Sequence, residues 1–196
     1  MFTGLVADRG RITSAVRSDG GALLTVQTRL ASELSDGDSV AVNGVCLTAT
    51  KIASGSFEAE VMNETLSRSS LAEATDGVEV NLELPLRASD RFGGHMVQGH
   101  IDGVGTITAA AADGFAQRLE IEAAPGLMRY VVHKGSIAVD GVSLTVAELD
   151  GSSFTVSLIP ETLERTNLGR AGIGTRVNLE VDVLAKYVEK LLGGIR

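Results

Sequence analysis

Hydrophobic and polar residues alternate along most of this chain, in short runs that are separated by glycine, aspartate and serine. Alternation with a period of two is typical of strands with one buried face, and the separating residues are those that form turns. In the first half we expect extended segments near residues 2–7, 10–17, 22–28, 38–43, 45–52, 56–62 and 78–84. In the second half we expect them near residues 97–102, 104–110, 117–123, 135–140, 142–149, 153–159 and 175–182. Units of about six short strands favour a small closed barrel, because closure removes exposed strand edges.

The same pattern occurs twice along the chain, as an internal repeat. Residues 37–83 recur at 134–180 with a constant offset of 97 and no gap, and residues 1–13 recur at an offset of 95. The stretch PLRASDRFGG between the copies has the composition of a linker. A repeat of this length predicts two similar domains. We place an N-terminal barrel at 1–90, a C-terminal barrel at 91–183 and a terminal helix at 184–196.

Two kinds of segment depart from the strand pattern. The sequence Glu-Thr-Leu at 64–66 and again at 161–163 predicts a helix of one or two turns, with Pro160 as a start signal and Gly169 as a stop signal. The tail places apolar residues at helical spacing, namely Leu184, Val188, Leu191 and Leu192, with Ile195 beyond. This apolar face packs either on its own barrel or on another copy of the chain.

Charge and cysteine content narrow the class of protein. The net charge of −8 without any basic run disfavours nucleic acid and anionic membrane surfaces as partners. The apolar stretches are shorter than the roughly 20 residues of a membrane span, and the first residues lack the features of a secretory signal. One cysteine without a disulfide partner predicts a reducing, cytoplasmic location.

The candidate chemistry lies where the two copies differ. Alternation puts Cys46 and Thr48 on one face of a strand, and Ser143 and Thr145 occupy the equivalent positions of the second copy. The opposite, apolar face must form the barrel core, so the thiol and hydroxyls look outward or into a groove. Polar groups beside apolar ones in a shallow groove suit a flat heterocycle.

Structural alternatives exist for each of these residues. A lone cysteine is usually a small buried hydrophobe, and a glutamate in a first helical turn interacts with the helix N-terminus. Asn43 and Asp140 each precede a glycine, which is typical of a tight hairpin turn. His95 and His100, five residues apart on an expected strand, fall on opposite faces, which disfavours a metal site. Phosphate-binding loops and the serine nucleophile elbow are absent from the sequence.

Five motifs, in order and with matching spacing, carry a resemblance to a known family. They are MFTGLV at the start, NGVCLT at 43–48, GGHMVQGHI at 93–101, KGSIAVDGVSLTV at 134–146 and LIPETLERTNL at 158–168. Together they cover essentially the whole chain, and the chain resembles the riboflavin synthase family. The resemblance implies an all-β fold of two similar six-stranded Greek-key barrels with a C-terminal α-helix through which three chains associate.

The resemblance also implies an activity. Two molecules of 6,7-dimethyl-8-ribityllumazine exchange a four-carbon unit, which gives riboflavin and 5-amino-6-ribitylaminouracil without a metal or redox cofactor. The reaction begins with proton removal from the C7 methyl of one lumazine, while a nucleophile activates the other at C7. The active site is expected between the N-barrel of one chain and the C-barrel of its neighbour. Lumazine synthase is a further candidate partner, which the sequence leaves open.

Matching positions carry the family's substrate contacts over to this chain. For the N-barrel groove these are Gly4, Leu5, Val6, Cys46, Leu47, Thr48, Glu60, Met62, Asn63, Glu64 and Thr65. For the C-barrel groove they are Gly99, His100, Ile101, Lys134, Ser143, Leu144, Thr145, Ser157, Ile159, Pro160, Glu161 and Thr162. Many family members carry lysine at the position of Asn63, a difference that we expect to alter ribityl contacts but not the reaction.

The expected catalytic residues are Cys46, Ser143, His100 and Asp140, with Ser39 as an outside candidate. In this hypothesis Cys46 marks the acceptor site as nucleophile or proton carrier, and Ser143 and His100 assist methyl deprotonation. The principal alternative is a non-catalytic lumazine- or flavin-binding antenna protein, and a second is a structural β-barrel adaptor. The reactive residues and both Glu-Thr pairs are present, which favours the enzyme.

Overall fold

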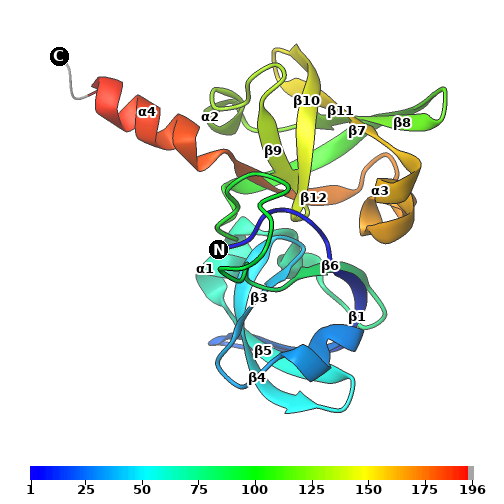
Figure 1. Cartoon of the computed structure of the whole chain (residues 1–196), viewed down its shortest axis with the longest axis vertical. Helices are drawn as coiled ribbons and strands as arrows, with labels where there is room; N and C mark the ends of the chain where they lie inside the picture. Colours follow the sequence, from blue (N-terminus) through cyan, green and yellow to red (C-terminus); the bar gives the residue numbers. More distant parts are fainter. Residues whose placement is uncertain (194–196) are drawn as a thin grey trace.

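The computed structural model describes residues 1–193 and contains two closed six-stranded barrels, stacked one on the other (Figure 1). The first is formed by β1 (Asp8–Ser18), β2 (Gly21–Gln27), β3 (Ser39–Val42), β4 (Val45–Ala53), β5 (Ser56–Met62) and β6 (Glu79–Glu83). The second is formed by β7 (Gly103–Asp113), β8 (Ala116–Glu122), β9 (Ser136–Val139), β10 (Val142–Asp150), β11 (Ser153–Leu158) and β12 (Arg176–Val181). The predicted pair of barrels is confirmed.

Strand order is the same in both barrels. The first runs β1-β2-β5-β4-β3-β6 around the barrel, and the second repeats this as β7-β8-β11-β10-β9-β12, with antiparallel pairing throughout. Short helices connect or follow the strands: α1 (Asn63–Arg68), α2 (Pro125–Met128), α3 (Pro160–Arg165), and the 3-10 turns η1 (Arg29–Glu33), η2 (Ser70–Glu73) and η3 (Asn167–Arg170). The predicted helices at the Glu-Thr-Leu segments are therefore confirmed as α1 and α3.

Alternation along β4 and β10 explains where the cores lie. Val45, Leu47 and Ala49 point inward and are buried, whereas Cys46 is half-buried and Thr48 is exposed on the outer face. The equivalent strand of the second barrel shows the same pattern. One face of each strand therefore closes a hydrophobic core, and the other is left free for a site.

The segments at 2–7 and 97–102 are not strands of their own barrels, and that expectation is wrong. Each is extended but irregular, and the only bridge in either segment joins Phe2 to Val97 between the two copies. Val6 packs against the core of the second barrel, and Ile101 packs against the core of the first. The copies have exchanged these segments, so each barrel is completed by a piece of the other half.

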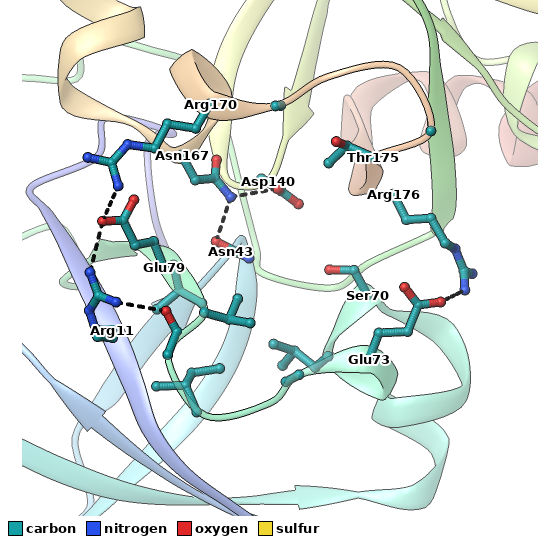
Figure 2. A pocket seen from close by; sticks show the side chains of 18 residues that line it. Arg11, Asn43, Ser70, Glu73, Glu79, Asp140, Asn167, Arg170, Thr175 and Arg176 are labelled. Carbon is teal, nitrogen blue, oxygen red and sulfur yellow. Dashed lines mark hydrogen bonds and ion pairs between the residues drawn. The ribbon is translucent and has the colours of Figure 1, made fainter.

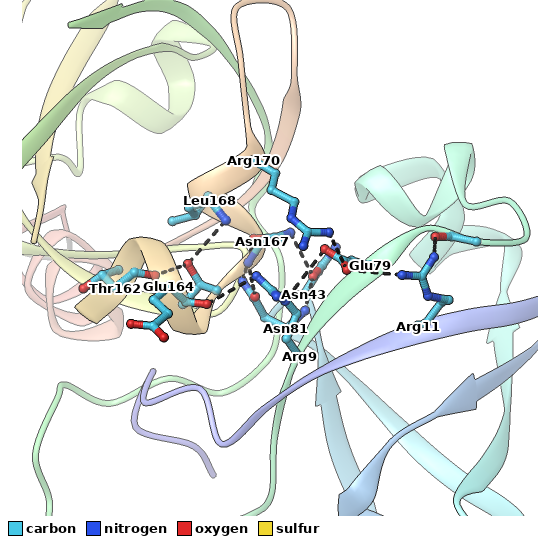
Figure 3. Close-up of polar contacts among 12 residues, drawn as sticks. Arg9, Arg11, Asn43, Glu79, Asn81, Thr162, Glu164, Asn167, Leu168 and Arg170 are labelled. Carbon is cyan, nitrogen blue, oxygen red and sulfur yellow. Dashed lines mark hydrogen bonds and ion pairs between the residues drawn. The ribbon is translucent and has the colours of Figure 1, made fainter. Parts of the chain in front are cut away.

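Polar side chains fill the interface between the barrels (Figure 3). Asn81 donates to the backbone oxygen of Asp140 over 2.9 Å, and its equivalent Asn178 donates to that of Asn43 over 2.8 Å. Asn167 donates to the Asp140 carboxylate over 2.8 Å. Beside this network a small apolar cluster joins the halves, formed by Phe2, Ala41, Val97 and Ala138.

The terminal helix α4 (Val183–Gly193) projects away from both barrels (Figure 1). Its contacts with the body are polar, including Lys186 to Asp102 and Glu189 to Arg129 and Tyr130. Its apolar residues remain between 53% and 71% exposed: Leu184, Tyr187, Val188, Leu191 and Leu192. The apolar face does not pack on its own barrel, so that alternative is wrong. Residues 194–196 of the expected helix, including Ile195, lie outside the described residues.

Candidate functional site

A groove of about 470 Å³ lies on the outer face of the first barrel, beside Cys46. Such a volume is within the range of small-molecule sites, roughly 300–1,000 Å³. Its lining consists of Val45, Cys46, Met62, Glu64, Thr65, Arg68, Ser69, Gly99, His100, Ile101 and Asp102. The groove thus combines a thiol, an imidazole and hydroxyls with the apolar side chains of Met62 and Ile101, as expected for a flat heterocycle.

The backbone of residues 99–101 forms one wall of this first groove. The Cys46 N–H donates to the Gly99 carbonyl over 2.9 Å. Gly99 adopts φ +81°, and a Cβ at this residue would lie 2.5 Å from the Cβ of Cys46. Only glycine permits this close approach in this conformation, which explains its presence in the motif.

The equivalent position of the second barrel repeats the arrangement around Ser143. The Ser143 N–H donates to the Gly4 carbonyl over 2.8 Å, and Gly4 has φ +78°. The linker also approaches here, because a Cβ on Gly94 would lie 3.1 Å from the Cβ of Ser143. The surface around Ser143, called the second groove below because it is equivalent to the Cys46 groove, is therefore bordered by the linker as well as by the exchanged segment.

The exchange changes the expected grouping of residues. Gly4 and Val6, expected in the groove of the N-barrel, border Ser143 and pack on the C-barrel. Gly99 and Ile101, expected with Ser143, line the Cys46 groove instead. The assignment of these residues to the two grooves was wrong, because it assumed that each repeat builds its groove from its own residues.

The histidines near the two grooves also differ from the expectation. The exposed His100 lines the Cys46 groove, so its expected pairing with Ser143 is not observed. His95 takes that place, with its Nδ1 atom 2.7 Å from the Ser143 Oγ. The sequence reasoning missed His95 as a functional residue. The sequence held no signal for this contact, because His95 stands in an irregular stretch just before the exchanged segment 97–102.

His95 has an unusual environment. The residue is 7% exposed, and its Nε2 atom has no hydrogen-bond partner among the described residues. Burial lowers the pKa of His95 below its usual value, while the charge of Asp182 opposes this shift. The neutral ring is therefore favoured, and a neutral imidazole can exchange a proton with the Ser143 hydroxyl.

Asp140 occupies a structural position. Its carboxylate accepts hydrogen bonds from the backbone N–H of Asn178 over 2.7 Å and from the Asn167 side chain. Burial raises its pKa to about 6. Asn43 and Asp140 both adopt positive φ angles, of 47° and 46°, in the hairpin turns. The turn alternative is confirmed for both residues, and Asp140 does not line the Cys46 groove.

Several expected binding residues, and the catalytic candidate Ser39, do not line the Cys46 groove. Leu47 and Leu144 point into the cores, and Ser39 pairs with Thr48 across β3 and β4. The Asn63 side chain donates to the Asp19 carbonyl. The remaining ones are exposed or half-buried on the outer faces or at the ends of strands and helices, namely Leu5, Thr48, Glu60, Thr145, Ser157, Ile159, Pro160, Glu161 and Thr162.

Lys134 is strained in a way that its equivalent is not. It adopts φ 63°, where the first copy has Gly37 at φ 93°. Both residues donate their N–H to the next strand, over 2.9 Å to Val146 and 2.8 Å to Ala49. A lysine in a position that suits glycine costs backbone energy.

A second cavity of about 520 Å³ separates the barrels on another side (Figure 2). Its walls carry ion pairs, Arg170 to Glu79 over 2.7 Å and Arg176 to Glu73. Neither Cys46 nor Ser143 lines this cavity, so the candidate site is the Cys46 groove together with the equivalent surface around Ser143. Within residues 1–193, no group of three or more His, Cys, Asp or Glu side chains could hold a metal ion. None of the helices described is long and apolar enough to cross a membrane.

Comparison with known proteins decides the family. The lumazine binding domain matches residues 3–85 and, a second time, residues 98–182. The riboflavin synthase of Actinobacillus pleuropneumoniae is 46% identical over 193 residues, covering 98% of this chain and 90% of that protein. That of Mycobacterium tuberculosis strain H37Rv is 49% identical, covering 98% of each chain. This chain belongs to the riboflavin synthase family.

The fold of this family member also matches solved structures. LumP in complex with 6,7-dimethyl-8-(1'-D-ribityl) lumazine superposes with a TM-score of 0.84, covering 92% of this chain and 99% of that chain. LumP in complex with riboflavin gives a TM-score of 0.87. Both are 22% identical in sequence, so the likeness concerns the fold.

Proposed function

We propose that this chain is a riboflavin synthase, a transferase that converts two molecules of 6,7-dimethyl-8-ribityllumazine into riboflavin and 5-amino-6-ribitylaminouracil. Family membership supports the reaction. The observation that supports the proposal from the structure is the pair of equivalent positions with unlike reactive groups, Cys46 in its groove and Ser143 beside His95. A reaction between two identical molecules needs two similar places with different roles.

The residues divide into two sets. In the first groove Cys46 and His100 act on one lumazine, with Glu64 and Thr65 at the groove wall as its polar contacts. In the second groove Ser143 acts with His95, which exchanges a proton with the serine hydroxyl. General acid–base catalysis of this kind contributes about 10²- to 10⁴-fold to a rate. His95 thus takes the role that the sequence assigned to His100.

The direct test mixes the purified chain with 6,7-dimethyl-8-ribityllumazine and follows the appearance of riboflavin by absorbance. We expect conversion without added metal or cofactor. Cys46→Ser and Ser143→Ala are then compared with the natural chain, with lumazine binding measured separately. Unchanged rates in both variants would refute the assigned roles. Binding of lumazine without any conversion would support the antenna alternative instead.

We further propose that the chain acts as a homotrimer assembled through α4. The exposed apolar residues of α4 support a partner helix, because an apolar stripe on a helix is stabilised by burial. In this assembly the first groove of one chain faces the second groove of its neighbour, and the two lumazines gain effective concentration. Light scattering on the natural chain and on a chain lacking residues 184–196 tests the assembly.

Two finer points complete the proposal. The single cysteine cannot form an intrachain disulfide, which supports action in the reducing cytoplasm. Association with lumazine synthase follows from the resemblance alone, and co-sedimentation of the two purified proteins tests it.

A further inference from the structure

Two buried glutamates occupy equivalent positions of the repeat and have no part in the chemistry proposed above. Glu83 lies at the end of β6 and Glu180 lies near the end of β12, and the residues are 7% and 1% exposed. Burial raises the pKa of both carboxyl groups, that of Glu180 to about 7. A buried carboxylate is costly unless hydrogen-bond donors surround it. The donors here are therefore informative.

Each carboxylate holds two successive backbone amides of an exchanged segment. Glu180 accepts from the Gln98 N–H over 2.7 Å and from the Gly99 N–H over 2.9 Å. Glu83 accepts from the Thr3 N–H over 2.7 Å and from the Gly4 N–H over 2.9 Å. The two clamps match in their backbone hydrogen bonds, and Glu83 additionally accepts from the Thr3 hydroxyl over 2.7 Å.

The glycine in each clamp is fixed from both sides. Glu180 binds the Gly99 N–H, and the carbonyl of the same residue accepts from Cys46 on the other barrel. His100 and Ile101 follow directly and line the first groove. A carboxylate rooted in the second barrel thus determines where the wall of the first groove lies.

We propose that Glu180 is a positioning residue for the Cys46 groove and that Glu83 is its counterpart for the Ser143 groove. Each glutamate acts through the backbone of the exchanged segment and touches no substrate. The catalytic meaning of this clamp rests on the proposed function of the grooves, but the clamp itself does not. Each half of the chain thereby sets the geometry of the groove carried by the other half.

The Glu180 clamp has an additional connection to the terminal helix. Asp102, at the end of the same segment, accepts from the Val181 N–H over 2.9 Å and pairs with Lys186 of α4. The first copy has Ala7 in the place of Asp102, so only the Cys46 groove is linked to α4 in this way. Charged groups that face Glu180 are therefore Asp102 and Lys186.

Replacement by glutamine tests the clamp sharply. Glutamine keeps the size of the side chain, but one of its two terminal atoms is a donor and would face a backbone N–H. One hydrogen bond of the pair is lost, and the segment over Cys46 opens more often. Cys46 is the only cysteine of the chain, so its reaction with iodoacetamide reports on this groove alone.

The experiment measures the alkylation rate of Cys46 without lumazine in the natural chain, in Glu180→Gln and in Glu83→Gln. We expect Glu180→Gln to raise the rate about fivefold, the effect of one lost hydrogen bond on local opening, and Glu83→Gln to leave it unchanged. Glu180→Asp keeps the charge but is too short to reach both amides, so its rate should lie between. If thermal melting shows that Glu180→Gln is unfolded, Glu180→Asp takes its place in the test.

Turnover supplies the second readout. Glu180→Gln should raise the KM for lumazine more than it lowers kcat, because binding geometry is lost while the reactive groups stay. Equal Cys46 alkylation rates in Glu180→Gln and Glu83→Gln would overturn the proposal. Because the alkylation contains no lumazine, it judges the clamp even if the conversion assay refutes the proposed function.

Discussion

At the scale of single residues, the two grooves differ in two ways. One carries the Cys46 thiol and the other the Ser143 hydroxyl, and the histidine nearest to each of these groups is different. Ser143 has the buried His95 within 2.7 Å, whereas Cys46 shares its groove with the exposed His100. Burial lowers the pKa of His95 and favours its neutral ring, while the side chain of His100 is exposed to solvent. In the proposed mechanism, proton transfer by the buried His95 belongs to the Ser143 groove, and the exposed His100 is the acid–base partner in the Cys46 groove.

Replacement of His95 tests this difference. His95→Gln should lower kcat by about 10²-fold, because the variant keeps a polar side chain but loses proton exchange with Ser143. The exposed His133→Gln serves as the matched control and should keep the natural rate. Steady-state turnover of lumazine provides the measurement, with circular dichroism to verify folding. A rate for His95→Gln within twofold of the control would remove His95 from the mechanism.

Asp140 gives a residue-scale prediction of stability. Its pKa rises from 3.8 to about 6 on folding, so the folded chain binds the proton more tightly than the unfolded chain. This contribution to stability amounts to about 3 kcal/mol below pH 3.8, declines as pH rises from there, and is lost once pH has passed about 6. Asp140→Asn cannot titrate and should lack this decline. Its counterpart in the first barrel, Asn43, is already an asparagine.

Urea unfolding of both chains between pH 4 and pH 8 measures the effect as a difference of unfolding free energies. The natural chain should lose stability relative to Asp140→Asn as pH rises through this range. Subtraction cancels other titrating groups, including Glu180, whose pKa is also raised. Parallel curves would show that the Asp140 carboxylate is not perturbed by its burial.

The sequence predicted some of these residues and could not predict others. The mismatch between Cys46 and Ser143 follows from alignment of the repeat, and alternation places both on the outer face. His95 could not be assigned, because its contact with Ser143 joins residues 48 positions apart through an irregular segment. Asp140 was expected in catalysis, but its carboxylate accepts hydrogen bonds from Asn178 of β12 and from Asn167 of η3, contacts that the sequence alone does not reveal.

At the scale of elements, the exchange of the two extended segments is the feature that local pattern could not reveal. Phe2 and Val6 alternate in the way a strand of their own barrel would, yet Val6 packs on the other core. The alternation reports only that one side of the segment is buried, and it does not say against which partner. Short hairpins connect half of the strand pairs in each barrel, and these local pairs follow directly from the sequence.

The close approach of the exchanged segment to β4 can be tested with a matched pair of glycine variants. Gly99 and Gly55 share a positive φ of 81° and 83°, but only Gly99 has a neighbour where a Cβ would lie, 2.5 Å from Cys46. Both Gly99→Ala and Gly55→Ala should lose about 1 kcal/mol of unfolding free energy to backbone strain. Gly99→Ala should lose more and should bind lumazine at least tenfold more weakly.

Chemical denaturation and fluorescence titration with lumazine measure the two quantities. Gly55→Ala should keep natural affinity, because its loop is remote from any of the contacts that border the Cys46 groove. The difference between the variants isolates the steric contact from the backbone conformation. Equal affinities would mean that the segment retreats from β4 without disturbing the groove.

At the scale of the whole molecule, a single chain holds two grooves that cannot serve one reaction unless they meet. Cys46 and Ser143 lie on different barrels, and each barrel carries its groove on the outer face of β4 or β10. The apolar residues of the terminal helix lie exposed, while polar contacts connect the helix to the C-terminal barrel. In the proposed assembly, association of chains through α4 would connect the stability of the assembly with catalysis.

Substitution on α4 tests this connection. Leu191 and Lys190 are both exposed neighbours near the helix end, but only Leu191 belongs to the apolar face, where it is 71% exposed. Leu191→Gln should cost about 2 kcal/mol of association free energy per chain. The variant trimer should therefore dissociate at higher protein concentrations than the natural trimer. Lys190→Gln should assemble normally. Specific activity of Leu191→Gln should fall on dilution in parallel with the mass measured by light scattering, because separated chains cannot bring two lumazines together. Full activity in a monomeric Leu191→Gln would place both lumazines within one chain and exclude catalysis between neighbours.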